Sequence, residues 1–192
     1  MKKISILFAS LFVIGSTYAQ TTWTIDKSHS KVGFSVAHMV VSETEGNFKD
    51  FEGKVISKTE DFNGAEVEFT AKVASVNTEN EKRDGHLKSA DFFAAEQYPA
   101  IDFKGQLKLV SGSDYKLVGA LTIRETTKDV ELTAEFGGTV VDPWGNTKAG
   151  FELNGKINRK DFGLGWNALT EAGGMVVSEE VKLHINVELA KG

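Results

Sequence analysis

Few side chains in this sequence have the types and the spacing that chemistry requires. The four histidines, His29, His38, His86 and His184, are scattered, and none is paired at the i and i+4 spacing of a helical metal site. Metal centres gather three or four ligands, often in a recognisable pattern. The chain has no cysteine, and no serine stands in a Gly-x-Ser-x-Gly turn. The sequence therefore predicts neither a catalytic residue nor a metal site.

Some polar groups admit two interpretations. Ser28-His29-Ser30 is expected to bend the chain into the strand that follows. The cluster Arg83-Asp84-Gly85-His86 either recognises a polar ligand group or ties a helix to the rest of the fold, and we favour the second role. His38 and Tyr115 are the only ionisable residues that alternation places on an apolar face. An enzymatic role would depend on them.

Period-two alternation of apolar and polar residues defines the elements that must position these groups. The alternating segments are 32–38, 48–55, 65–73, 101–109, 115–123, 130–136, 149–157 and 181–189. Turn residues such as Asn63-Gly64 separate them, which favours antiparallel neighbours. One helical insertion is expected around 78–96, with a capping box from Thr78 to Glu81.

These patterns predict an all-β fold, an eight-stranded antiparallel β-barrel, because closure removes exposed strand edges. Its interior is either filled by side chains or left with a slot for one small ligand. An outer-membrane barrel, whose apolar side chains face lipid, is the alternative. Missing aromatic girdles, glycines on the apolar face and the helical insertion count against it.

A glycine-bearing loop over residues 162–177 breaks the alternation. It contains apolar residues that would be costly to leave in water, among them Leu164, Trp166, Leu169 and Met175. Long loops of this kind are often binding loops or lids. We expect this loop to cover a barrel mouth or to form a pocket wall, and a plain packed loop is the alternative.

The N-terminus has the parts of a secretory signal peptide. Lys2 and Lys3 precede an apolar run of about a dozen residues, which is shorter than a membrane span, and small and polar residues follow up to Ala19. We expect cleavage after Ala19, a mature domain of residues 20–192, no stable membrane insertion, and a periplasmic or secreted location. Loss of both lysines leaves 20 basic and 27 acidic residues, a formal charge of −7, so nucleic acid is not an expected partner.

Seven sequence pieces, in order, resemble the YceI-like family. They are Trp23–Asp26, His29–Phe34, Gly46–Phe48, Arg83–Ser89 with Asp91–Phe93, Tyr98-Pro99, Leu121–Arg124 and Ile157–Gly163. The resemblance spans essentially the whole mature chain. It implies a lipocalin-like barrel whose apolar lumen holds a polyisoprenoid or similar amphiphile. Glu125 stands where the family often has glycine, which leaves the geometry of that turn open.

We therefore expect a non-enzymatic lipid-binding protein that carries an isoprenoid or quinone-like ligand and needs no other cofactor. A barrel enzyme acting on a lipid or quinone and an interaction module with a filled core are the alternatives. A phenylalanine at Gly119 or Ala134 should block the lumen without unfolding the domain. The expected lipid contacts are Phe34, Val36, Phe51, Val67, Phe69, Phe92, Phe103, Gly119, Leu121, Ile123, Leu132, Ala134, Phe136, Phe151, Phe162, Leu164, Trp166 and Met175.

Overall fold

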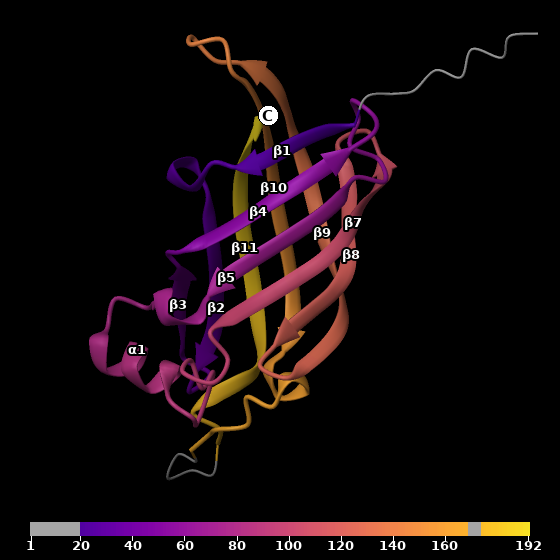
Figure 1. Cartoon of the computed structure of the whole chain (residues 1–192). Coiled ribbons are helices and arrows are strands. Elements are labelled where there is room, and N and C mark those ends of the chain that lie inside the picture. The colour runs from indigo at the N-terminus through magenta and orange to yellow at the C-terminus, as the bar shows by residue number, and fades with distance from the viewer. Residues whose placement is uncertain (1–19, 169–173) are drawn as a thin grey trace, which may run out of the picture.

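The computed structural model describes residues 20–168 and 174–192, and they form one antiparallel sheet curled into a barrel (Figure 1). The segment expected to be a signal peptide lies outside the described residues. The strands are β1 (Thr21–Ile25), β2 (Lys31–His38), β3 (Ser42–Phe48), β4 (Phe51–Ser57), β5 (Glu66–Lys72), β6 (Val76–Asn77), β7 (Ala100–Ser111), β8 (Asp114–Ile123), β9 (Thr126–Val141), β10 (Thr147–Asn158) and β11 (Val177–Lys191). The helices are η1 (Lys27–His29), η2 (Val73–Ser75), α1 (Glu81–Lys88) and η3 (Arg159–Phe162), of which only α1 is an α-helix.

Closure of the barrel depends on the long final strand. The ring runs β1-β4-β5-β7-β8-β9-β10-β11, and β1 pairs with the end of β11, where Ile25 lies opposite Leu189. Nearer its start, β11 pairs instead with β2, and β2, β3 and β6 extend the sheet beyond the ring. The prediction of an eight-stranded antiparallel barrel with a short helical insertion is confirmed.

The eight ring strands are not the eight that alternation predicts. The predicted strand 48–55 is two strands, because β3 ends at Phe48 and β4 begins at Phe51. These two apolar residues are three positions apart, so the alternation changes phase at the reversal. Asp50 in this reversal accepts hydrogen bonds from Lys72 Nζ (2.6 Å) and Lys27 Nζ (3.2 Å). The ring strand β1 was not predicted, since only two of its five residues, Trp23 and Ile25, are apolar.

The helical insertion begins two residues later than the predicted capping box. Asn80 is the N-cap of α1, and its side-chain oxygen accepts a hydrogen bond from the backbone N–H of Arg83 (3.0 Å). Glu79, which precedes the cap, has a positive φ of 59°. In the described part of the chain, no helix is long and apolar enough to cross a membrane.

Charged side chains pair across the outer face of the barrel. Glu68 on β5 lies between Lys54 on β4 (2.9 Å) and Lys104 on β7 (3.6 Å), and Lys116 pairs with Glu131 across β8 and β9 (2.7 Å). The apolar residues that alternate with them face the interior. This polarity is the reverse of that in an outer-membrane barrel, whose apolar side chains face lipid.

The turn between β8 and β9 needs no glycine at position 125. The residue with a positive φ in this turn is Arg124 (56°), and not Glu125. The Arg124 guanidinium lies 5.4 Å from the ring centroid of Tyr98, and its Nη1 donates a hydrogen bond to the carbonyl of Gly163 (3.1 Å). These contacts offset the strain of a non-glycine residue in the left-handed region.

Candidate functional site

The barrel encloses a cavity of about 620 Å³. Its wall is formed by the inward-facing side chains of the ring strands and of β2 and β3. Wall residues such as Phe69, Leu183 and Ile185 are only partly buried, because they pack against the core on one side and face this open space on the other. The alternative of a completely filled core is therefore wrong.

Most of the predicted lipid contacts line this cavity. They are Phe34, Val36, Val67, Phe69, Phe92, Phe103, Leu121, Ile123, Leu132, Phe151, Leu164 and Trp166. The strands β2, β5 and β7 to β10 supply most of them, while the turn after α1 supplies Phe92 and the segment after η3 supplies Leu164 and Trp166. Segments far apart in the sequence thus contribute to one apolar wall.

Aromatic rings close one end of the cavity. Phe62, in the loop between β4 and β5, is almost fully buried, with ring centroids 5.1 Å from Trp23, 5.5 Å from Phe136 and 5.3 Å from Phe151. Tyr115 contacts Phe136 (6.3 Å) and Phe151 (5.9 Å). We call Trp23, Phe62, Tyr115, Phe136 and Phe151 the aromatic plug. No alternation marks Phe62, so sequence reasoning missed it.

Five further predicted contacts do not line the cavity. Phe136 belongs to the plug, whereas Phe51, Ala134 and Phe162 are buried among other side chains. Met175 is 41% exposed on the surface. Alternation tells which side chains point inward, but it does not tell at which height along the barrel axis they lie.

Gly119 lies in the barrel wall but offers no room for a ligand contact. It is paired with Gly105, and a Cβ atom on it would lie 2.3 Å from the carbonyl oxygen of Lys104 and 2.8 Å from Cζ of Phe103. The Phe103 ring therefore occupies the space above the two glycines. The expectation that a phenylalanine at Gly119 would block the lumen without disturbing the fold is wrong, because the sheet itself would have to shift.

Polar side chains gather at the end of the cavity opposite the aromatic plug, which we call the mouth. These lining residues are Thr44, Thr78, Asn80, Lys82, Arg83, His86 and Arg159. They come from β3, α1 with the residues before it, and η3. Of the described residues that line the cavity, those with a permanent charge are all basic. The cavity is thus apolar along its length and polar at one end.

The cluster 83–86 holds α1 in place and also faces the cavity. Buried Asp84 accepts hydrogen bonds from the backbone N–H (2.8 Å) and the hydroxyl (2.6 Å) of Thr78. Arg83 Nε donates to the same hydroxyl oxygen (2.7 Å), and Nη2 donates to the Thr78 carbonyl (2.8 Å). His86 packs edge-on against Trp166 (4.8 Å between ring centroids). These contacts support the structural role, while Arg83 and His86 also line the mouth.

Arg159 anchors the described ends of the glycine-bearing loop. Its guanidinium, which is almost fully buried, donates to the carbonyls of Leu164, Trp166 (2.8 Å) and Ser178 (2.8 Å). Burial lowers the pKa of Arg159. Leu164, Trp166, Val176 and Val177 line the cavity, so these parts of the loop form a pocket wall. Leu169 lies outside the described residues.

The two ionisable residues that alternation placed inside the barrel lie at its opposite ends. His38 lines the cavity and pairs with Val177 at the start of β11. Tyr115 belongs to the aromatic plug, where its hydroxyl donates to the carbonyl of Asp61, and burial raises its pKa. They cannot act on one reacting group as an acid and base pair.

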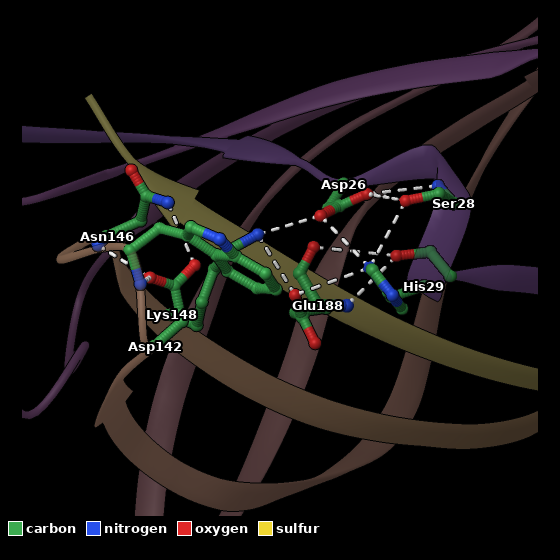
Figure 2. A network of polar contacts seen from close by, with 9 residues as sticks. Asp26, Ser28, His29, Asp142, Asn146, Lys148 and Glu188 are labelled. Carbon is green, nitrogen blue, oxygen red and sulfur yellow. Dashed lines mark hydrogen bonds and ion pairs between the residues drawn. The ribbon is translucent and has the colours of Figure 1, made fainter.

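A second polar cluster lies outside the barrel, near the β1–β11 closure (Figure 2). Asp26, His29 and Glu188 place potential ligand atoms within 4.8 Å of one another. The Lys148 ammonium lies 2.7 Å from Asp26 Oδ2 and 3.0 Å from Glu188 Oε1, so a positive charge already lies beside both carboxylates. Its hydrogen bond holds the pKa of Asp26 well below the usual range, and Asp26 in turn raises the pKa of Lys148. We interpret the cluster as a clamp on the closure.

Comparison with known proteins assigns the chain to a family. Residues 23–189 match the model of the YceI-like domain. The chain belongs to the YceI-like family. A UPF0312 protein of Staphylococcus aureus is 34% identical over 171 residues, which cover 88% of this chain and 98% of the relative. The structure of the Campylobacter jejuni YCEI protein is similar at 35% identity with a TM-score of 0.66, covering 86% of this chain and 95% of that one.

Two structures with lower sequence identity share the fold. Burkholderia cenocepacia BcnA has 22% identity and a TM-score of 0.74, over 85% of this chain and 98% of BcnA. A Saccharophagus degradans domain described as polyisoprenoid binding has 16% identity and a TM-score of 0.61, over 88% of this chain and 98% of that domain. At these identities the likeness extends to the barrel architecture alone.

Proposed function

We propose that this YceI-like protein is exported and carries an isoprenoid or similar long-chain lipid in its barrel. The observation that carries the proposal is the polarity of the cavity of about 620 Å³, whose wall is mostly apolar, whose one end is closed by the aromatic plug and whose mouth is polar. An amphiphile with one apolar chain and one polar end has the matching polarity. The described polyisoprenoid binding of the S. degradans neighbour supports an isoprenoid as the chain.

Binding in this cavity needs no chemical step. Each buried methylene group contributes about 0.8 kcal/mol, so a chain of several isoprene units offsets the cost of association. Side chains of the mouth donate hydrogen bonds or carry positive charge, as do Lys82, Arg83 and Arg159. They favour a polar end with acceptor oxygens, whether that end belongs to an isoprenoid or to a quinone-like lipid.

Extraction of the native protein tests the ligand. The protein is purified without detergent from a bacterial host, extracted with organic solvent and analysed by mass spectrometry. The expected result is an isoprenoid at close to one molecule per chain. A titration of the lipid-free protein with geranylgeraniol provides an independent measurement. If extraction releases no lipid and the protein also fails to bind geranylgeraniol, the proposed function is contradicted.

The proposed export has its own test. The full chain is expressed in a bacterial host, which is then separated into periplasmic and cytoplasmic fractions. Because the signal peptide is expected to end at Ala19, intact-mass analysis should give a periplasmic or secreted protein that begins at Gln20. A cytoplasmic protein that retains Met1 would refute export without affecting the assignment of the ligand.

A further inference from the structure

The turn between β2 and β3 exposes apolar side chains beside the mouth. Val40 is 91% exposed and Val41 is 82% exposed, and Met39 and Met175 are also exposed. The backbone N–H of Met39 donates to the carbonyl of Val176 (2.8 Å), which brings the turn and Met175 together. We call Met39, Val40, Val41 and Met175 the rim tip.

The backbone of the rim tip is strained, and Val40 gains almost no packing in return. Met39 and Val40 have positive φ angles of 50° and 64°. A left-handed conformation is uncommon for any residue other than glycine, and for a β-branched residue such as valine it is a genuine outlier. A folding requirement would select glycine or asparagine here. The chain instead displays a valine to the solvent, which points to a binding role for the side chain.

The rim tip continues the apolar wall of the cavity. His38, directly before it, and Val176 and Val177, directly after Met175, line the cavity. A lipid leaving the cavity along this wall would pass His38 and reach the rim tip directly beside it. Lys82 and Arg83 line the same mouth, and their charge complements anionic lipid head groups.

A second exposed apolar turn lies at the other end of the barrel. Val140 (64% exposed), Val141 (63% exposed) and Trp144 belong to the β9–β10 hairpin and its turn. Figure 1 shows this hairpin projecting from the end of the barrel away from α1 and from the β2–β3 turn. A membrane contact through the hairpin would point the mouth away from the bilayer. The hairpin therefore offers a matched control.

We propose that the rim tip is a membrane-contacting surface that inserts its apolar side chains into the interface of a phospholipid bilayer and so brings the mouth to the lipid. A turn that projects three apolar residues suits the interfacial region of a bilayer, where apolar side chains leave water and nearby basic groups meet phosphates. The role of this contact in lipid transfer rests on the proposed function. The contact itself is tested separately, by binding to vesicles.

The test compares two valine pairs in flotation assays with phosphatidylcholine vesicles, with and without phosphatidylglycerol. The Val40→Asn/Val41→Ser variant removes the rim valines, and Val140→Ser/Val141→Ser removes the pair at the opposite end. The rim variant should bind vesicles at least tenfold more weakly than the parent, and the hairpin variant should stay within twofold. Asparagine tolerates the left-handed conformation, so the rim variant should keep or raise the melting temperature of the parent.

Other outcomes would overturn the proposal. Parent protein that does not float with either vesicle, or equal losses in both variants, would refute a contact through the rim tip. A parent that is dimeric in analytical ultracentrifugation, and becomes monomeric in the rim variant, would show that the rim tip binds a second copy of the chain. Titration of each protein with geranylgeraniol in the absence of vesicles reports the proposed function independently, because the rim tip lies outside the cavity.

Discussion

Replacing Val130 with tryptophan would test whether the cavity holds the ligand chain. Val130 lines the cavity from β9, and its side chain is only partly buried. The indole ring can extend into the cavity in front of it, so the fold should be retained. The same substitution at Val118, on the opposite face of β8 and beside Glu131, is the matched control.

The size of the effect follows from the volume of the cavity. At about 30 Å³ for each water-sized group, 620 Å³ holds roughly 20 carbon-sized groups, or about four isoprene units. The additional atoms of tryptophan fill the space of about one such unit. Burying one unit of five carbons contributes about 4 kcal/mol at most. The affinity for a chain of four units should therefore fall between about tenfold and a thousandfold.

The assay is a competition titration of lipid-free protein against a fluorescent apolar probe, with prenols of two to eight isoprene units. In the parent, affinity should rise with chain length up to about four units and then level off, because further units extend out of the mouth. In Val130→Trp the plateau should begin about one unit earlier. Val118→Trp should follow the parent.

Unchanged affinity across the series in a folded Val130→Trp protein would refute the placement of the chain in this cavity. If the affinity of the parent keeps rising up to eight units, the aromatic plug must open and the available space must be larger than 620 Å³. Circular dichroism and urea unfolding of both variants would distinguish lost binding from lost folding.

Two further predictions concern stability. Gly119→Ala should destabilise the protein by about 1–3 kcal/mol in urea unfolding, because the new Cβ would lie 2.3 Å from a backbone oxygen. Gly137→Ala should be tolerated, because the atom nearest to its Cβ would lie at 3.6 Å. Equal losses of stability in the two variants would refute this argument. Because the pKa of Asp26 is lower in the folded than in the unfolded protein, the contribution of Asp26 to stability is complete above the unfolded-state pKa of 3.8 and is lost as the pH falls below it. Asp26→Asn keeps the acceptor for the Ser28 N–H. It should be less stable than the parent at pH 6 and should lose less stability when the pH is lowered. Parallel profiles of stability against pH for the two proteins would contradict the role of Asp26 as a clamp.

Alternation and turn residues were sufficient to predict the barrel and most of its inward-facing positions. The physical reason is local, since successive side chains of a strand point to opposite faces wherever that strand lies. Phe69, Phe103 and Leu121 could thus be assigned to the cavity from their own segments. The alternation changes phase between Phe48 and Phe51, and this change in the sequence marks the point where the chain reverses from β3 to β4.

Only the tertiary structure decided where along the barrel each inward residue lies and which end is closed. Phe136 and Leu132 have the same position in the alternation, yet Phe136 joins the plug and Leu132 lines the cavity. The plug centres on Phe62, a loop residue with a positive φ that no periodicity marks. The ring closes because β11 pairs with β1, and β11 also holds β2 beside the mouth. Such long-range contacts determine the height of each residue, the plug and the mouth.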